Sequence, residues 1–327
     1  MLSILGMGCS HPSTVISNCF LEQLGIDSSA EWILAKIGIQ ERRTVLPLEY
    51  ISGDKNRDPR RALSVASHTS LQLGGMAAAE ALARAGIEAS QLGLVLSNCC
   101  TPEGFIPNEA QRLSRFLGID VPAYDVQTAC PSFALHIDHL VKYQESELPD
   151  YVLCVSTAAM TTKVNYADRS DSSILSDGAA AWVVSGRKPG RLRVEASSFI
   201  ADSRRWEAVS IKSFGHFQQN GRAIRDFSVR QTVHILKDLE KKYNLDWKRD
   251  VFVGHQANAT MLEQIVNNRK IPKQNHWHNV EKYGNQAGAG APAVLAQKWD
   301  CIKPGQKIVV VVVGAGLSWG ALVLNAC

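Results

Sequence analysis

Short apolar runs recur along the chain between longer segments whose apolar residues repeat at helical spacing. The runs lie near residues 94–98, 152–156, 251–255 and 308–312 and are rich in Val, Ile and Leu. Runs of this length predict buried strands, whereas the periodicity of segments such as 68–85 and 229–243 predicts amphipathic helices. The alternation indicates an α/β fold with mainly parallel sheets covered by helices.

The predicted strands form one long internal repeat. The run at 94–98 matches that at 251–255 with an offset of 157 residues, and the run at 152–156 matches that at 308–312 with an offset of 156. The sequence therefore predicts two repeated α/β halves that pack as one body. Their boundaries are residues 1–186 and 187–327, and each half is expected to open with a strand, at 3–8 and 192–197, and to close with another, at 180–185 and 320–324.

The first half is longer than the second because of two insertions, near residues 27–61 and 161–176. Insertions on a repeated scaffold are usually loops that carry binding residues. We therefore expect substrate contacts in these two segments.

Composition and charge narrow the class of protein. The 327 residues are 45% apolar with a formal net charge of +4, and the basic residues are scattered rather than gathered in one run. This charge allows an anionic partner such as a phosphorylated cofactor or an acidic carrier protein, but no nucleic-acid motif accompanies it. None of the eight cysteines forms a C-x-x-C pair, which predicts a reducing compartment without structural zinc. With no secretory signal and no apolar run long enough to span a membrane, we expect a cytoplasmic protein.

The candidate chemistry centres on Cys130. A short β-type segment at 123–126 precedes it, and Pro131 and a helical apolar pattern follow it, which places the thiol at a helix N-terminus. Unpaired N–H groups and the helix dipole at that position favour a thiolate, so we expect a lowered pKa and a nucleophile. Because free cysteines are also often buried as small apolar residues, this segment alone leaves both interpretations open.

Two further residues lie at matching places in the repeat. His255 ends a predicted buried strand, and Asn285 lies two residues from position 287, which the repeat makes equivalent to Cys130. Each has a structural alternative, a hydrogen-bonded core histidine and a helix cap, but together with Cys130 they favour catalysis. A Cys-His-Asn set also occurs in papain-like proteases, yet the local signature of those enzymes is absent around Cys130.

With these residues in place, the chain resembles the β-ketoacyl-acyl carrier protein synthase III family of the thiolase superfamily over essentially its whole length. The resemblance implies the thiolase fold, two repeated halves in a layered α-β-α-β-α arrangement. It rests on the segments Ser29 to Arg42, Asp125 to Phe133, Asp168-Arg169, Leu175 to Val184, Gly254-His-Gln-Ala-Asn258, Tyr283-Gly-Asn285 and Gly314 to Gly320.

The family's catalytic roles can be carried over to four positions. The resemblance implies that Cys130 accepts the acyl group, and that His255 and Asn285 stabilise the enolate formed when a malonyl group decarboxylates. It also implies that the backbone N–H groups of Cys130 and Ala315 form an oxyanion hole.

The resemblance further implies substrate contacts. Trp32 is expected to stack on the adenine of coenzyme A and Arg169 to contact its phosphorylated end, with Lys36 and Asn258 as further coenzyme A contacts. Two departures from the family pattern affect binding. Lys36 stands where the family commonly has Arg, and Ala259-Thr260 where it often has an Arg that contacts the carrier protein. Another basic face is available from Arg222, Arg225 and Arg230.

The predicted reaction is decarboxylative Claisen condensation of an acyl group from acyl-coenzyme A with a malonyl thioester on coenzyme A or an acyl carrier protein. The setting would be fatty-acid-type or specialised, polyketide-like biosynthesis. No cofactor beyond these substrates, no metal and no nucleic-acid or membrane partner is expected, and the family implies a homodimer in which the loop around Phe105 reaches the partner subunit.

Three alternatives remain at this stage. Condensation of two acyl chains without decarboxylation could use Glu103 or Glu109 as a base, although we expect both carboxylates to be solvated. Transfer of the acyl group to another nucleophile is the second alternative. The third, a catalytically silent scaffold subunit, is disfavoured by the retained Cys130, His255 and Asn285.

Overall fold

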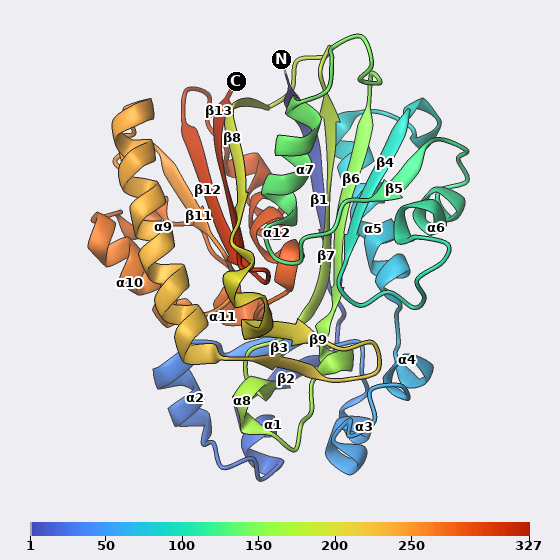
Figure 1. Cartoon of the computed structure of the whole chain (residues 1–327), viewed down its shortest axis with the longest axis vertical. Helices are drawn as coiled ribbons and strands as arrows, with labels where there is room; N and C mark the ends of the chain where they lie inside the picture. The colour runs from blue at the N-terminus through green and yellow to red at the C-terminus, as the bar shows by residue number, and fades with distance from the viewer. Residues whose placement is uncertain (1) are drawn as a thin grey trace.

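The computed structural model describes residues 2–327 and contains one nine-stranded sheet that is divided by helices into two halves. Figure 1 shows the layers side by side: helices, half-sheet, central helices, half-sheet, helices. This is the predicted layered α-β-α-β-α arrangement of an α/β protein. The strand order is β11 (Val251–Gly254), β12 (Lys307–Gly314), β13 (Ser318–Ala326), β8 (Leu192–Ala201), β1 (Ser3–Ser10), β7 (Asp177–Ser185), β6 (Val152–Ala159), β4 (Leu94–Cys99) and β5 (Ala123–Asp125).

The two halves of the sheet meet where β1 pairs with β8, through Ser3 opposite Arg193 and Ile4 opposite Leu192. Parallel pairing is confined to β4 with β5, β4 with β6 and β11 with β12. The strands nearer the middle of the sheet pair antiparallel, so the predicted mainly parallel pairing describes only the outer strands of each half. Apolar runs do not encode strand direction, and the short turn between β12 and β13 can join only antiparallel neighbours.

The repeat extends through both half-sheets. β4 and β6 correspond to β11 and β12, whereas β1 and β7 correspond to β8 and β13. The counterpart of β5 is a single parallel bridge between Phe252 and His276. The second half therefore keeps four full strands and only a remnant of the fifth.

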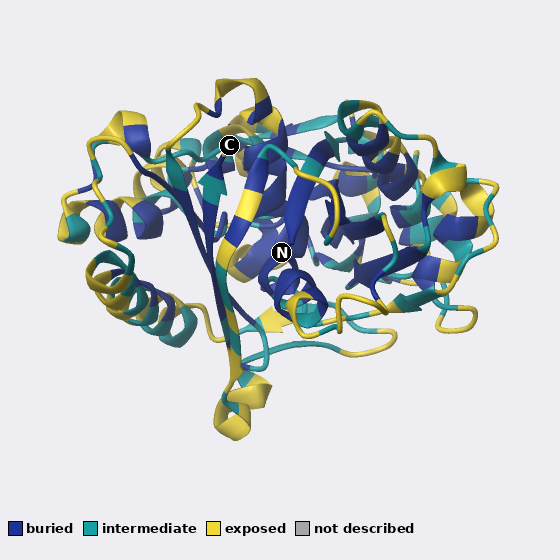
Figure 2. Cartoon of the chain, turned by 90° about the horizontal axis from the view of Figure 1, so that it is seen from above, coloured by how far each residue is buried: buried dark blue, intermediate teal, exposed yellow. Residues whose placement is uncertain are grey.

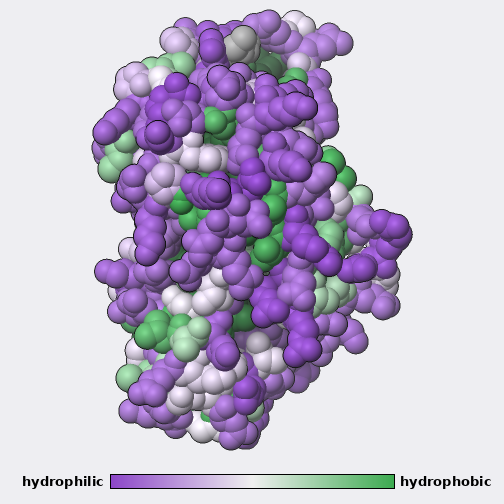
Figure 3. All heavy atoms as spheres, turned by 90° about the vertical axis from the view of Figure 1, so that its left-hand side faces the viewer, coloured by the Kyte–Doolittle hydropathy of each residue, from purple (hydrophilic) through white to green (hydrophobic). Residues whose placement is uncertain are grey.

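The central layer consists of α7 (Ser132–Val141) and α12 (Gly290–Gln297). The outer layers are α5 (Ser70–Ala85) with α6 (Glu109–Phe116) on one side and α9 (Gly221–Tyr243) with α10 (Ala259–Arg269) on the other. The strands and the central helices are largely buried, as the dark colours of Figure 2 show. Only Ser228, Thr232 and Leu236 of the long helix α9 are buried, and its face of the molecule is mainly hydrophilic (Figure 3).

Two glycines of β1 allow α5 to lie directly on the sheet. A Cβ added at Gly6 would lie 2.4 Å from the carbonyl oxygen of Ala81, and one at Gly8 would lie 2.2 Å from that of Ala77. Any side chain at either position would push the helix away from β1.

The two predicted insertions pack against each other at one end of the molecule, the lower edge of Figure 1. The fully buried Arg42 donates from Nε to the carbonyl oxygen of Ser173 at 2.9 Å, and Asn56 Nδ2 donates to those of Thr162 and Val164 at 3.0 and 2.8 Å. The insertions contain α2 (Ala30–Ile37), β3 (Glu41–Arg43), α3 (Leu48–Asp54), η2 (Met160–Lys163) and α8 (Arg169–Ser172).

Short elements complete the chain. They are β2 (Val15–Ser17), α1 (Asn18–Gln23), α4 (Ala62–Val65), η1 (Ala89–Gln91), η3 (Ser203–Ala208), β9 (Val209–Ile211), β10 (Phe217–Gln219), η4 (Lys273–Asn275), α11 (Val280–Tyr283), η5 (Ala287–Ala289) and η6 (Trp299–Cys301). Across residues 2–327, every helix is too short or too polar to cross a lipid bilayer.

Candidate active site

Cys130 lies in a tight turn between β5 and α7, in the layer between the two half-sheets. Helix α7 begins at Ser132 with Pro131 in the cap position, one residue later than the sequence predicted. Ala129 has a φ of +55°, a left-handed conformation that is energetically unfavourable for any residue other than glycine. The backbone therefore turns sharply just before the thiol.

The end of β12 packs directly on this turn. A Cβ added at Gly314 would lie 2.7 Å from Cβ of Cys130, so only glycine fits there. The next residue, Ala315, directs its backbone N–H toward the Cys130 sulfur, as does Cys130 its own. The two N–H groups predicted for the oxyanion hole thus meet at the sulfur, although the role itself stays a prediction.

Burial raises the pKa of Cys130 to about 12, and the N–H groups of Ala315 and Cys130 offset only part of this effect. The predicted lowering of this pKa is therefore wrong. The N–H groups act in the expected direction, but desolvation of the charged thiolate outweighs them.

Buried polar side chains on neighbouring strands hold in place the turn that contains Cys130, which we call the nucleophile turn. Asn98, at the end of β4, accepts a hydrogen bond from the Thr128 N–H at 3.1 Å and donates to Ser156 Oγ at 3.0 Å. Ser132 Oγ donates to the same hydroxyl at 3.1 Å. Sequence reasoning missed these residues, although polar residues at the ends of apolar strands were the available signal.

His255 follows β11 directly, as predicted, and is buried. Burial lowers its pKa to about 4, so the imidazole is neutral near pH 7. Its Nδ1 has no hydrogen-bond partner among residues 2–327. A neutral imidazole has one N–H donor and one acceptor nitrogen to offer a ligand.

Asn285 is held by a parallel bridge to Leu175. Its N–H donates to the carbonyl oxygen of Ile174 at 3.0 Å, and its carbonyl oxygen accepts from the Ser176 N–H at 2.9 Å. Its Oδ1 accepts from the Ala287 N–H at 3.0 Å, which leaves the Nδ2 donors for a substrate.

The segment after Asn285 touches the nucleophile turn. A Cβ added at Gly288 would lie 2.6 Å from the carbonyl oxygen of Ala129 and 2.4 Å from Ser132 Oγ. Ala287 also has a positive φ, +48°, and lies three residues before α12, as Ala129 lies three residues before α7. Gly288 is therefore the structural counterpart of Cys130, and the repeat brings both turns to the centre of the molecule.

The predicted coenzyme A residues form a second group on the insertions and α10. The Arg169 guanidinium lies over the Trp32 ring, 4.9 Å from its centroid, and its Nη1 donates to the Asp27 carbonyl oxygen at 2.9 Å. Trp32 is partly exposed, and an indole with a guanidinium on one face is a stacking platform for an aromatic ring.

Lys36 and Asn258 lie close together where α2 meets α10. Thr260 Oγ1 lies 3.0 Å from the Lys36 carbonyl oxygen and 2.7 Å from Asn258 Oδ1, and its single O–H can donate to either oxygen. Asn258 caps α10 by accepting from the Met261 N–H at 3.0 Å. The structure thus gives Asn258 a structural role, and its contact with substrate stays a prediction.

The two acidic residues near Phe105 differ from each other. Glu103 is partly exposed and pairs with Arg112 at 3.6 Å. Glu109 is only 3% exposed, and neither carboxylate oxygen has a partner among the described residues. The prediction that both are solvated is wrong for Glu109, whose burial raises its pKa to about 7. Among residues 2–327, no cluster of three or more His, Cys, Asp or Glu side chains could hold a metal ion.

Comparison with known proteins agrees with this geometry. Two family profiles match, "3-Oxoacyl-[acyl-carrier-protein (ACP)] synthase III" over residues 124–203 and its C-terminal counterpart over residues 246–326. The β-ketoacyl-[acyl-carrier-protein] synthase III of Chlamydia pneumoniae is 29% identical over 346 residues, covering 99% of this chain and 96% of the relative. That of Aquifex aeolicus is 27% identical and covers 98% of both chains.

Solved structures give the same result. The crystal structure of the Aquifex aeolicus synthase III superposes with a TM-score of 0.86 at 27% identity and covers 99% of this chain and 100% of its own. The priming β-ketosynthase of the R1128 polyketide pathway has a TM-score of 0.84 at 25% identity, with 100% and 97% coverage.

The two repeated halves, together with these relatives, identify the protein as an acyltransferase of the thiolase fold. Within that class, the chain belongs to the β-ketoacyl-[acyl-carrier-protein] synthase III family of condensing enzymes.

Proposed function

We propose that this enzyme loads an acyl group from acyl-coenzyme A onto Cys130 and condenses it with a malonyl thioester. The observation that carries the proposal is the pair of N–H groups from Cys130 and Ala315 facing the Cys130 sulfur in the turn between the halves. Two such donors stabilise the oxyanion that forms when the sulfur attacks a thioester carbonyl.

In the loading step, the Cys130 sulfur attacks the acyl carbonyl and the bond to the coenzyme A sulfur breaks. The thiol proton ends on the departing coenzyme A, so the step is balanced without a further reactant. The raised pKa of Cys130 keeps the resting thiol protonated near pH 7. Attack therefore requires that proton to leave as the new bond forms.

In the condensing step, the malonyl thioester loses CO₂ and becomes an enolate. The imidazole N–H of His255 and the Nδ2 group of Asn285 are the donors proposed for the enolate oxygen. The enolate carbon then bonds to the acyl carbonyl carbon, the bond to the Cys130 sulfur breaks, and the thiolate takes up a proton from water. A neutral imidazole suits this role because it can donate a hydrogen bond to the enolate oxygen while keeping its own proton.

The experiment is to follow CO₂ release and the β-ketoacyl product by mass spectrometry for the wild type, His255→Ala and Asn285→Ala. Loss of one donor should lower CO₂ release by about 10²-fold, while loading of Cys130 from acyl-coenzyme A persists. Condensed product without CO₂ release would instead establish condensation of two acyl chains, and loss of loading in both variants would contradict the assigned roles.

We also infer a homodimer that joins through the free edge of β5. β5 ends the sheet, and the neighbouring loop exposes Phe105 and Ile106 by 71% and 91%. An unpaired sheet edge beside exposed apolar side chains favours association with another copy.

The proposed setting is fatty-acid-type or polyketide-like biosynthesis in a reducing, cytoplasmic compartment. The eight free cysteines fit the reducing compartment.

A further inference from the structure

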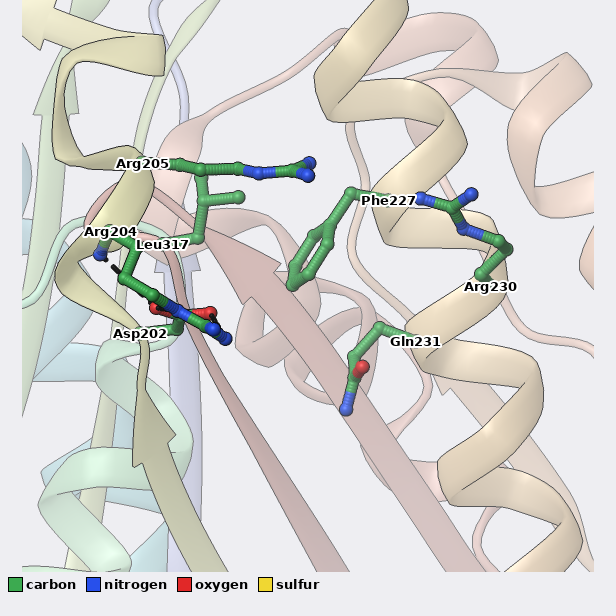
Figure 4. Close-up of a pocket in the computed structure, with 7 residues that line it drawn as sticks. All are labelled: Asp202, Arg204, Arg205, Phe227, Arg230, Gln231 and Leu317. Carbon is green, nitrogen blue, oxygen red and sulfur yellow. Dashed lines mark hydrogen bonds and ion pairs between the residues drawn. The ribbon is translucent and has the colours of Figure 1, made fainter.

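The short turn that carries the Ala315 N–H joins β12 to β13 and borders a cavity on one side. Ala315 lies between Gly314 and Gly316, and Gly316 has a φ of +128°, a conformation that only glycine adopts readily. Figure 4 shows the next residue, Leu317, in the wall of a cavity of about 500 Å³ between η3 and α9, opposite Phe227. Because close packing does not hold this side of a glycine-rich turn, polar contacts have to fix its conformation.

Ser318, the first residue of β13, supplies such a contact. Its side chain is buried, and its Oγ donates to the Ala315 carbonyl oxygen at 2.7 Å. Since a carbonyl oxygen can only accept, the single hydroxyl proton of Ser318 is used in this bond. The bond fixes the peptide group between Ala315 and Gly316, and with it the residue whose N–H faces the Cys130 sulfur.

A second polar contact holds the far end of the same turn. The Asp202 N–H donates to the Leu317 carbonyl oxygen at 2.7 Å. This bond lies beyond Gly316, where the backbone can still rotate, so it does not by itself fix the direction of the Ala315 N–H.

Ser318 is in turn held from the other half of the molecule. Thr128 Oγ1 lies 3.3 Å from Ser318 Oγ, and because the Ser318 proton is already donated to Ala315, Thr128 is the donor. The Thr128 N–H donates to Asn98 Oδ1 at 3.1 Å. Thr128 lies two residues before Cys130, so this chain of hydrogen bonds joins the two backbone segments that supply the N–H groups of the proposed oxyanion hole.

We propose that Ser318 is a positioning residue for this oxyanion hole, and that with Thr128 it sets the spacing between the Cys130 and Ala315 N–H groups. The inference rests on the proposed function, because loading of Cys130 is the step that needs these donors. N–H groups stabilise an oxyanion strongly only when they lie about 2.7–3.1 Å from it, so a small displacement of the turn slows the reaction.

The test is the rate at which Ser318→Ala accepts an acyl group on Cys130, followed by rapid quenching and intact-protein mass spectrometry. At saturating acyl-coenzyme A the rate constant should fall about tenfold, because one donor moves away from the oxyanion. The acyl-coenzyme A concentration that gives half the maximal rate should stay within about twofold, since the predicted platform of Trp32 and Arg169 is built from other elements.

This readout separates positioning from a purely structural role. If Ser318 only stabilised the fold, Ser318→Ala would leave less of the protein able to load, while the loadable fraction reacted at the wild-type rate. That result would overturn the proposal.

A double-mutant cycle tests whether Thr128 acts through Ser318. Thr128→Val keeps the shape of the side chain and removes the donor, and it should slow loading by about threefold, because an O–H···O bond of 3.3 Å is long. Adding Thr128→Val to Ser318→Ala should slow loading no further, since the acceptor is already gone. Independent effects of the two substitutions, or wild-type loading by Thr128→Val, would contradict the proposed chain.

Ser10→Ala is the matched control. Ser10 Oγ donates to the Leu73 carbonyl oxygen at 2.6 Å, between β1 and α5, so the variant loses the same kind of bond in an outer layer of the molecule. Its loading rate should equal that of the wild type.

The positioning role and the proposed function can fail separately. If Ser318→Ala loads at the wild-type rate, the positioning role is wrong and the condensing function stands. If the wild type itself accepts no acyl group on Cys130, the proposed function fails and this inference fails with it.

Discussion

At the scale of single residues, the Cys130 thiol is subject to two opposing effects. Burial disfavours its charged form, and the N–H groups of Ala315 and Cys130 favour it, with a resulting pKa of about 12. The thiol of the resting enzyme should therefore be far less reactive toward simple alkylating agents than a thiolate cysteine.

This predicts the pH dependence of Cys130 alkylation. The rate with iodoacetamide should rise about tenfold per pH unit up to at least about pH 10, because the thiolate fraction grows without saturating. Peptide mass mapping separates Cys130 from the exposed Cys19, Cys301 and Cys327. A plateau in the Cys130 rate near neutral pH would contradict the raised pKa.

The buried Glu109 should make the folding stability of the protein depend on pH. Its pKa is about 7 in the folded protein against 4.5 for the free side chain, because burial outweighs the attraction of Arg112, and Asp125 and Glu103 add repulsion. Its contribution to stability is therefore complete below about pH 4.5 and is lost as the pH rises through 7. The free energy of unfolding of Glu109→Gln, relative to that of the wild type, should therefore rise by roughly 3 kcal/mol between pH 4.5 and pH 8.

Urea unfolding of both proteins at several pH values measures this difference. Other buried acids such as Asp177 are common to both proteins and cancel in the comparison. Glu103→Gln, on the partly exposed ion pair with Arg112, is the control and should change stability by less than about 1 kcal/mol at any pH. A pH-independent effect of Glu109→Gln would mean that the carboxyl group is not desolvated.

Sequence reasoning reached the residues whose position follows from strand and helix ends. It placed Cys130 before a helix and His255 after a strand, and the resemblance supplied Trp32 and Arg169, which the structure brings into contact. It did not reach the burial of Glu109 or the sign of the Cys130 pKa shift. Both depend on how closely β4, α6 and β12 pack around these side chains, and this packing leaves no local pattern in the chain.

At the scale of elements, the site depends on close backbone contact between β12 and the nucleophile turn. We predict that Gly314→Ala abolishes acyl loading, because the new Cβ would lie 2.7 Å from Cβ of Cys130 and 2.8 Å from Cδ of Pro131. The overpacking should also cost about 1–3 kcal/mol of stability.

Thermal unfolding and acyl loading together check this prediction. Gly53→Ala is the matched control, since an added Cβ there meets nothing within 4 Å, and it should retain loading and stability. Full loading by Gly314→Ala would show that the turn can move away from β12 without loss of function.

The elements themselves were largely predictable, while their directions were not. Each of the apolar runs expected to form a strand does so, and α9 is longer than predicted because its first two turns carry few apolar residues. Antiparallel pairing at β1, β7, β8 and β13 arises from tertiary connections that apolar runs do not encode. The reduced fifth strand of the second half likewise appears only once His276 is seen beside Phe252.

At the scale of the whole molecule, the proposed dimer predicts a change in mass. The wild type should elute as a particle of about twice the 35.8 kDa chain in light-scattering chromatography. The Phe105→Asp/Ile106→Asp variant should shift toward the monomer, since charges replace apolar side chains at the proposed interface. Phe214→Asp, an equally exposed aromatic residue on another loop, is the control, and a monomeric wild type would contradict the dimer.

The central claim, that the two repeated halves together hold an acyl-accepting cysteine, is tested most directly by intact-protein mass spectrometry. The enzyme is incubated with a panel of acyl-coenzyme A thioesters and then with a malonyl thioester, alongside Cys130→Ala. We predict one acyl adduct on the wild type, none on the variant, and removal of the adduct by malonyl with release of a β-ketoacyl product. The absence of an adduct from every thioester, or an adduct on Cys130→Ala, would contradict the assignment of Cys130 as the nucleophile.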